Sequence, residues 1–324
     1  MAYVPRSEKE PAAAAEELNV AEVSVIILTF RRPELLRAAI ESVLSQEGLR
    51  TTVEVVVVDN DPERSAEQLY LDVVPKAALP TRYVSEPRAG ISHARNAGVA
   101  ASSGRYIAFL DDDEIAGPNW LSSLLSTAHD YEADIVLGPV KPHYPDGFLI
   151  PSCANQLYDR DAQVSTGQVV RRFNIGNSIL SRERCLASTT PFDPRFGLTG
   201  GEDSLLLARL IDEGRRCVWC SEAVVTETIP PERLTPLYLL GRALRQGQTT
   251  AYLPSALAHP QWWVVLRWMA IGAAQFCIFA PWGVALRLCG RDEWLSAMVK
   301  AASGLGKVFW HLKLHFRIYQ LRRP

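Results

Sequence analysis

Apolar runs alternate with amphipathic stretches over residues 23–110. Residues 23–28 (VSVIIL) and 53–58 (VEVVVV) are almost continuous β-branched and aliphatic runs, a pattern typical of strands buried on both faces. Further strands are expected near 82–84 and at 106–110, with helices at 33–44 and 93–101 between the strands. This alternation predicts an α/β domain with a mostly parallel, Rossmann-like sheet flanked by helices.

Polar residues directly follow three of the predicted strands: Thr29, Asp59 and Asp111. Because parallel α/β sheets bind ligands outside the carboxyl ends of their strands, we expect these side chains to converge on one crevice. The first strand continues into TFRRPE, which contains neither a glycine-rich dinucleotide fingerprint nor a P-loop. NAD enzymes and P-loop NTPases are therefore poor fits.

Four consecutive carboxylates, Asp111 to Glu114, follow the run 106–110. An acidic surface loop is one interpretation of this cluster. Carboxylates that end a buried strand also suit a hard divalent ion such as Mg2+ or Mn2+, which can hold substrate phosphates. Arg88 and Arg95 are candidate phosphate contacts, with a solvated helix face as the alternative for Arg95.

Five segments resemble, in order, the motifs of family 2 glycosyltransferases with the GT-A fold: VSVIILTFRRPELL, VEVVVVDND, AGISHARNAG, RYIAFLDDDE-x3-PNWL and FGLTGGEDSLLLARLIDEG. The resemblance extends over roughly residues 23–235. The stretch from GGEDSLLLARL to LGRALRQGQ further resembles bacterial exopolysaccharide enzymes of the succinoglycan-biosynthesis type.

The resemblance implies roles for individual residues of this chain. Thr29, Phe30 and Asp59 would hold the base and ribose of a nucleotide-sugar. Asp111 and Asp113 correspond to an acidic pair that binds ribose and a divalent metal, with Asp113 as the more direct ligand. Asp203 matches the catalytic base, and Glu202 stands beside it.

The chemistry of sugar transfer supports a carboxylate at position 203. A single displacement at the anomeric carbon needs a base near the acceptor hydroxyl and positive charge on the departing diphosphate. Asp203 follows two glycines and precedes an amphipathic stretch at 204–212. A purely structural role at the start of that helix is the alternative.

Two family features are missing. No histidine occurs at 224–228, where many relatives have an additional metal ligand, and the QxxRW signature of processive synthases is absent. The second absence favours transfer of one sugar over polymerisation. Arg245 and Gln246 could line the acceptor side or a solvated helix face, and Asn177 could face the acceptor or bond to its own backbone. Specificity is expected to lie between 138 and 176, where His143 is interpreted as a loop residue.

Composition changes this picture mainly at the ends of the chain. The 324 residues carry a net charge of −2, which excludes a strong global attraction to nucleic acid. The end of the chain after Glu293 is basic and rich in aromatic residues, which favours a membrane surface over an RNA partner. Cys217 and Cys220 form a CxxC within an expected strand, which would point them to opposite faces and so excludes a redox pair or zinc site. Reduced cysteines indicate a cytoplasmic protein.

The stretch 268–286 has no charged residue and is long enough to span a membrane. Four tryptophans between 262 and 282 favour the membrane interface, and Pro281 weakens a straight span. A single span would separate the catalytic domain from the cationic end, which should both stay in the cytosol. We therefore expect a re-entrant or interfacial helical hairpin that is broken near Pro281.

These observations predict a disordered tail at 1–20, a GT-A domain at 21–235 and a membrane-associated helical region at 236–324. The nucleotide-binding half is expected at about 21–113 and the acceptor half at about 114–235. The predicted function is transfer of one hexose, with inversion, from a UDP-sugar to a lipid-linked saccharide on the cytoplasmic face of the plasma membrane. This activity would serve exopolysaccharide or surface-glycan synthesis. A sugar-nucleotide-binding scaffold without turnover and a nucleotidyltransferase are the alternatives.

Overall fold

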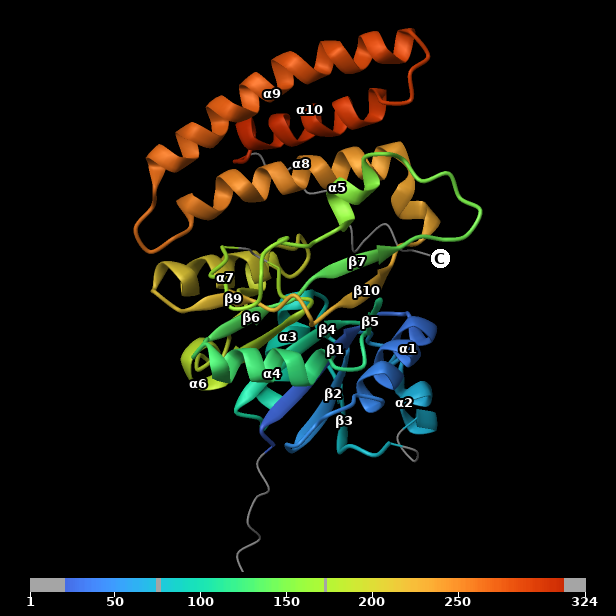
Figure 1. Ribbon diagram of the computed structural model, residues 1–324, viewed down its shortest axis with the longest axis vertical. Helices are drawn as coiled ribbons and strands as arrows, with labels where there is room; N and C mark the ends of the chain where they lie inside the picture. Colours follow the sequence, from blue (N-terminus) through green and yellow to red (C-terminus); the bar gives the residue numbers. More distant parts are fainter. Residues whose placement is uncertain (1–20, 74–76, 172–173, 312–324) are drawn as a thin grey trace, which may run out of the picture.

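The computed structural model describes residues 21–73, 77–171 and 174–311 (Figure 1), so the predictions for 1–20 and for the basic end at 312–324 lie outside the described residues. The central sheet has seven strands in the order β3 (Thr81–Ser85), β2 (Val53–Asp59), β1 (Val23–Thr29), β4 (Tyr106–Asp111), β8 (Ser178–Ser181), β6 (Ile135–Leu137) and β9 (Cys217–Trp219). Of these, β8 is antiparallel to both of its neighbours, while the other pairings are parallel. The mostly parallel sheet is therefore as predicted.

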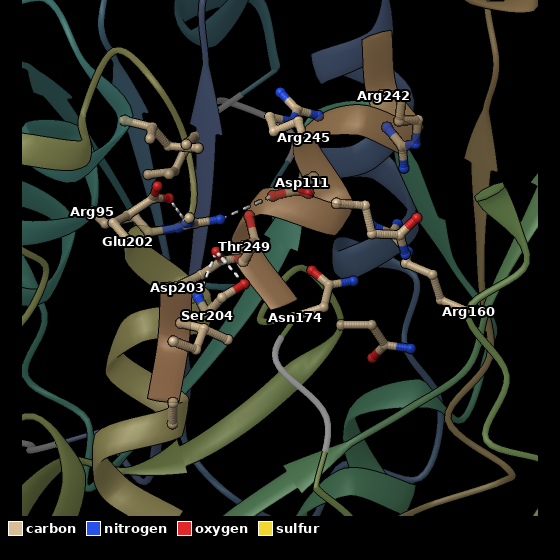
Figure 2. A pocket seen from close by; sticks show the side chains of 18 of the residues that line it. Arg95, Asp111, Arg160, Asn174, Glu202, Asp203, Ser204, Arg242, Arg245 and Thr249 are labelled. Atoms are coloured by element: carbon tan, nitrogen blue, oxygen red, sulfur yellow. Dashed lines mark hydrogen bonds and ion pairs between the residues drawn. The ribbon is translucent and has the colours of Figure 1, made fainter. Parts of the chain in front are cut away.

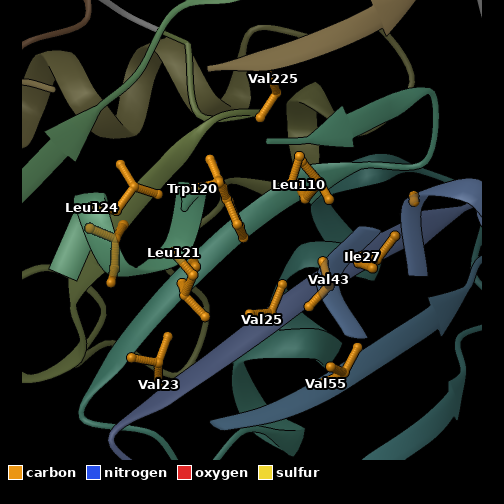
Figure 3. Packing of buried hydrophobic residues seen from close by; sticks show 14 of the residues in the cluster. Val23, Val25, Ile27, Val43, Val55, Leu110, Trp120, Leu121, Leu124 and Val225 are labelled. Carbon is orange, nitrogen blue, oxygen red and sulfur yellow. The ribbon is translucent and has the colours of Figure 1, made fainter. Parts of the chain in front are cut away.

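The apolar runs form strands because both faces of the sheet are covered. Along β1, Val23, Val25 and Ile27 point into one core and Ile26 into the other, as the two-residue period of a strand requires. Figure 3 shows the first of these cores, where Trp120 packs beside the strands. Burying one large aliphatic side chain fully stabilises the fold by about 1.5–3 kcal/mol.

Helices cover the two faces of the sheet. The first core contains residues of α1, α2 and α4, and the second contains residues of α3, α6 and α7. The bounds are α1 (Pro33–Leu44), α2 (Glu67–Val73), α3 (Ile91–Ala101), α4 (Trp120–Asp130), α5 (Ala154–Tyr158), α6 (Arg182–Cys185) and α7 (Glu202–Asp212), with short 3₁₀ helices η2 (Pro194–Phe196), η3 (Pro231–Leu234) and η4 (Leu253–Ser255). The first turn of α1 contains Pro33 and Glu34, which suit the free N–H groups and the dipole of a helix start.

A second, three-stranded sheet lies beside the carboxyl end of β4. Its order is β5 (Glu114–Ala116), β10 (Val225–Thr228) and β7 (Val140–His143). β10 pairs antiparallel to β5 in a register that sets Glu227 opposite Glu114. Residues that are far apart in the sequence are thereby brought to the end of the acidic run.

Cys217 and Cys220 lie in different cores, on opposite faces of the sheet. All six cysteines are free. The expectation that this CxxC does not converge on one site is confirmed.

Three helices form a layer at one end of the molecule: α8 (Pro236–Tyr252), α9 (Trp262–Leu288) and α10 (Trp294–Val308). Figure 1 shows α8 next to the sheet domain, α10 beyond it and α9 outermost. Gly247 and Gly306 lie where α8 crosses α10, and a side chain at either position would meet the backbone of the other helix. Gly272 and Gly304 do the same between α9 and α10. The three helices therefore pack closely along their lengths.

The expected break near Pro281 is wrong, because α9 runs without interruption through that residue. Proline removes one backbone hydrogen bond and usually costs about 3 kcal/mol inside a helix. Packing on both sides of Pro281 compensates: Lys300 lies over the Phe279 ring at 5.1 Å, and Gly283 lies against Met298. The chain instead reverses direction between the end of α9 at Leu288 and the start of α10 at Trp294, so the helical hairpin is formed by these two helices.

Candidate active site

A cavity of about 1080 Å³ opens at the carboxyl ends of the central strands. Its wall contains residues from the ends of β1 and β4, from the start of α7, and from α8 and the first part of α9. Seven of the eight predicted site residues line it: Thr29, Phe30, Arg95, Asp111, Asp113, Glu202 and Asp203. The crevice expected from the strand order is therefore present.

Asp59 is the predicted site residue that does not line this cavity. Its carboxylate is fully buried and accepts hydrogen bonds from the backbone N–H groups of Asp61 at 3.0 Å and Ala66 at 2.8 Å, and from the Tyr83 hydroxyl at 2.9 Å. These bonds hold the loop after β2. Its neighbour Asn60 does line the cavity, so Asp59 shapes the wall from behind, and direct contact with a nucleotide stays a prediction.

Asp112, Asp113 and Glu114 are buried and paired with arginines, so the surface-loop interpretation of the acidic run is wrong. Asp112 accepts hydrogen bonds from Thr29 Oγ1 and Arg32 Nη1, both at 2.9 Å. Burial raises the pKa of Asp112 to about 7, against the opposing charge of Arg32. Asp113 accepts from the same Arg32 nitrogen at 2.9 Å and lies 3.2 Å from Arg233 Nη1.

A second group of charges continues from this cluster into the small sheet. Arg160 Nη2 bridges Glu114 Oε1 at 2.8 Å and Glu227 Oε2 at 2.9 Å, and Arg233 reaches Glu227 Oε1 at 3.2 Å. Burial raises the pKa of Glu114 well above its usual range, reinforced by the charge of Asp111. The cluster therefore depends on arginines to keep several carboxylates in a small volume.

Asp111 is the most open carboxylate of the run, with 34% of its side chain exposed against 8% for Asp113. Its carboxylate lies 3.8 Å from Arg95. A β-carbon at Gly176 would come within 2.8 Å of Asp111 Oδ2, so the glycine makes room for this carboxylate. Desolvation raises the pKa of Asp111, and Arg95 opposes that effect.

Arg95 joins the two halves of the site, and the solvated-face interpretation of this residue is wrong. It is 3% exposed, forms an ion pair with Glu202 and also approaches Asp111, as Figure 2 shows. Burial raises the pKa of Glu202 to about 7, although Arg95 lowers it. The Glu202 carboxylate is therefore used in the buried ion pair with Arg95.

Asp203 lies on the cavity wall beside this pair (Figure 2). Gly201 adopts a left-handed φ of 96° and caps α7, which places Asp203 in the first turn and excludes it as the N-cap. Its Oδ1 accepts from the backbone N–H of Ser204 at 2.6 Å. A carboxylate in this position can take a proton from a group bound in the cavity.

Sequence reasoning missed Arg32, Arg160, Arg233 and Glu227. Arg32 stands three residues after the end of β1, so its place near the acidic run at the end of the neighbouring β4 was accessible from strand order alone. The other three come from distant segments that only the second sheet brings together. No local pattern marks them.

The other residues singled out in the sequence differ in whether they face the cavity. Arg245 and Gln246 line the cavity, whereas Arg88 pairs with Glu86 Oε2 at 2.6 Å and does not line it. Asn177 is 2% exposed, and its amide holds the Trp120 indole N–H at 2.7 Å and two backbone carbonyls. The interpretation that Asn177 bonds to its own backbone is therefore wrong, because its partners are distant in sequence.

Asp111 and Asp113 fit a divalent ion that takes its other ligands from a bound diphosphate and water, as Mg2+ sites commonly do. Over the described ranges, no group of three or more His, Cys, Asp or Glu side chains forms a metal cluster. An ion at Asp113 would also compete with Arg32 and Arg233. The protein donors alone therefore make an incomplete site.

Known proteins are similar to this chain in sequence and in fold. Residues 24–186 match the model of glycosyl transferase family 2. The chain is 33% identical over 237 residues to the succinoglycan biosynthesis protein ExoM of Rhizobium meliloti, covering 73% of this chain and 76% of that protein.

Two solved structures have a similar fold. The mannosyltransferase PcManGT from Pyrobaculum calidifontis, in complex with GDP-Man and Mn2+, gives a TM-score of 0.58 at 19% identity over 94% of this chain and 92% of that chain. TarS 1-349 of S. aureus, in complex with UDP-GlcNAc, gives 0.53 at 16% identity over 89% and 90%. The predicted GT-A fold and the resemblance to succinoglycan-type proteins are confirmed.

Proposed function

The chain belongs to glycosyltransferase family 2 and is a glycosyltransferase, and we propose that it transfers a single hexose from a UDP-sugar to a lipid-linked saccharide with inversion. One observation carries this proposal: Asp111 and Asp113 at the end of β4 share a cavity with Asp203 at the start of α7. Donor-side and acceptor-side carboxylates thus face the same space.

The chemistry follows from this arrangement. The acceptor hydroxyl oxygen bonds to the anomeric carbon while the bond from that carbon to the diphosphate oxygen breaks. Asp203 takes the hydroxyl proton, and the nucleoside diphosphate leaves with the bonding electrons. Glu202 is less suited to this role because it is buried against Arg95, and we assign it to positioning the start of α7.

Charge on the leaving diphosphate must be stabilised as it develops. A divalent ion held by Asp111 and Asp113 would supply that charge when bound. Thr29 and Phe30 line the same cavity and would contact the nucleoside. Arg95 keeps Asp111 and Glu202 in place on either side of the donor.

We further propose that α9 docks on the cytoplasmic leaflet of the plasma membrane. Within the described part of the chain, α9 is the helix whose length and apolar composition would allow it to cross a membrane. It lies along α10 in the outer layer, so docking in the plane of the interface keeps the helix layer intact, whereas a span would separate it. Trp262 and Trp263 at one end and Trp282 near the other are exposed, as interfacial aromatics are.

A nucleotide-sugar screen tests the reaction. The purified chain in detergent is supplied with UDP-, GDP- and dTDP-hexoses, Mn2+ or Mg2+, and a membrane lipid extract. We expect metal-dependent release of UDP that is lost in Asp203→Asn and Asp113→Ala. Glu213→Gln, which removes an exposed charge after the same helix, is the control and should retain activity.

Three outcomes contradict the proposal. Wild-type rates in Asp203→Asn would remove the assigned base. UDP binding without turnover in the presence of lipid extract would favour a scaffold. Pyrophosphate release from a nucleoside triphosphate and a sugar phosphate would identify a nucleotidyltransferase.

A further inference from the structure

Three arginines and four carboxylates form one continuous network beside the cavity, in which each arginine bridges two carboxylates. In order, its members are Asp112, Arg32, Asp113, Arg233, Glu227, Arg160 and Glu114. All three arginines line the cavity. The proposed donor chemistry uses Asp113 from this network but gives its arginines no role.

Arg233 lies on η3, directly after β10, and is held at both its backbone and its side chain. Its carbonyl accepts a hydrogen bond from the Tyr158 hydroxyl at 2.8 Å, and its Nη1 donates to Glu227 Oε1 at 3.2 Å. Its Nε and Nη2 groups donate no hydrogen bond to any residue that the structure describes. The side chain is 14% exposed and lines the cavity, so these donors are available to a bound anion.

Neutralisation of buried carboxylates does not by itself explain Arg233. Asp113 also accepts a hydrogen bond from Arg32 Nη1 at 2.9 Å, and Glu227 accepts one from Arg160 Nη2 at 2.9 Å. Each carboxylate that Arg233 contacts would therefore keep one arginine if Arg233 were removed. A role toward a ligand in the cavity accounts for the additional guanidinium.

The position of Arg233 also affects a cation at Asp113. Arg32 Nη1 and Arg233 Nη1 approach the same oxygen, Asp113 Oδ2, at 2.9 Å and 3.2 Å. A divalent ion bound to Asp113 would therefore lie beside two guanidinium groups, and like charges repel more strongly in a partly buried site than in water. The phosphates of a nucleoside diphosphate carry the opposite charge, so their binding would offset this repulsion.

We propose that Arg233 binds the diphosphate of the nucleotide-sugar, and that its contact with Asp113 makes metal binding and nucleotide binding depend on each other. This inference rests on the proposed function and adds a residue to its donor site. Without nucleotide, the guanidinium of Arg233 opposes an ion at Asp113. With nucleotide, the same guanidinium contacts phosphate oxygens that gain charge as the sugar leaves. By linkage, UDP and Mn2+ raise the affinity for each other by the same factor.

Two titrations of the full-length chain in detergent test this role. The first follows binding of Mn2+ alone by the electron paramagnetic resonance signal of the free ion, and the second follows binding of UDP at saturating Mn2+ by calorimetry. We expect Arg233→Met to bind Mn2+ alone at least about fivefold more tightly, because one of two competing cations is gone. The same variant should bind UDP about 10- to 100-fold more weakly, because a charged hydrogen bond is lost. Inorganic pyrophosphate should show the same fold loss as UDP, because it carries the group that Arg233 contacts.

Three further variants separate this role from damage to the fold. Arg233→Gln keeps a hydrogen-bond donor for Glu227 and should shift both affinities in the same directions as Arg233→Met, so it replaces the methionine variant if that variant does not fold. Arg233→Lys keeps the charge but not the planar fork, and should keep a Mn2+ affinity near that of wild type and more UDP affinity than Arg233→Met. Arg195→Met removes an arginine that is paired with Asp193 and does not line the cavity, and should leave both affinities unchanged.

Each contrary result has a definite meaning. Weaker binding of both ligands in Arg233→Met would show a supporting role in the fold and overturn the inference. A wild-type UDP affinity, or a Mn2+ affinity that does not rise, would also overturn it, and a loss for UDP without one for pyrophosphate would assign Arg233 to the nucleoside. If UDP turnover depends on Mn2+ and Asp203 while the two opposite shifts are absent, this inference alone fails. Failure to bind or turn over any nucleotide-sugar defeats the proposed function instead.

Discussion

Replacement of Arg95 by methionine tests whether the Arg95–Glu202 pair supports the two halves of the site. Both side chains are at most 4% exposed, so methionine leaves a buried carboxylate without its guanidinium partner. Breaking a buried ion pair in this way costs about 3–5 kcal/mol when the remaining group stays charged. Glu202 can avoid that cost by staying protonated, so pH 8.5, about 1.5 pH units above a folded pKa of about 7, limits the loss from its ionisation to about 2 kcal/mol. We therefore expect the free energy of unfolding to fall by about 2 kcal/mol more near pH 8.5 than near pH 5.5.

The loss should depend on pH in a direction set by Glu202. Its pKa is raised to about 7 in the folded protein, and removal of Arg95 raises it further because Arg95 lowers it. A folded pKa above the unfolded value lowers stability as pH rises through that window. Near pH 5.5 Glu202 is protonated in both folded proteins, so the difference in stability that comes from its ionisation disappears there. This difference between wild type and variant grows as pH passes about 7.

Urea unfolding at the two pH values measures this difference. Arg209→Met, a half-buried arginine on α7, is the control and should change stability by less than about 0.5 kcal/mol. Addition of Glu202→Gln to the Arg95→Met variant should remove the excess loss at high pH. An equal loss at both pH values, or no effect of Glu202→Gln, would refute the reasoning.

Three other variants test separate parts of the structure. Gly176→Ala places a β-carbon 2.8 Å from Asp111 Oδ2, so UDP release should fall at least about tenfold with little change in melting temperature; a wild-type rate would contradict the assigned role of Asp111. Asn177→Ala leaves the buried Trp120 N–H and two carbonyls without hydrogen-bond partners. The free energy of unfolding measured in urea should therefore fall by about 3 kcal/mol or more. Trp263 is 77% exposed, so Trp263→Ala should leave stability unchanged but weaken binding to anionic lipid vesicles about tenfold, and unchanged binding would remove α9 from the membrane surface.

The parts of the fold that depend on neighbouring residues could be predicted from the sequence. The alternation of β1 side chains between the two cores follows from the side-chain period of a strand, and the helix starting at Pro33 follows from its start signals. The convergence of Thr29 and Asp111 follows from a general property of parallel sheets. These inferences need no knowledge of distant contacts, which is why they agree with the structure.

The charge state of the site could not be predicted in this way. Four adjacent carboxylates indicate that a cation is needed, and a metal is the obvious candidate because no basic residue stands next to them in the sequence. The structure supplies guanidinium groups from Arg160, ahead of β8, and Arg233, after β10. These arginines come near the acidic run only when β5 and β10 pair. Counting the carboxylates in the sequence therefore overestimates the number of metal ligands, because several of them are paired with arginines.

The continuity of α9 depends on the same kind of long-range contact. The local rule penalises Pro281, and that rule alone led to a hairpin broken inside the apolar stretch. Close approach of Gly272 to Gly304 binds α9 to α10 before the proline, and Gly283 packs on Met298 after it. The free energy lost with one backbone hydrogen bond is smaller than the packing energy that α9 would lose by bending away from α10. Because α9 continues through Pro281 along α10, its exposed apolar side chains lie on the outer side of the helix layer, and α8 is left to face the cavity with Arg242.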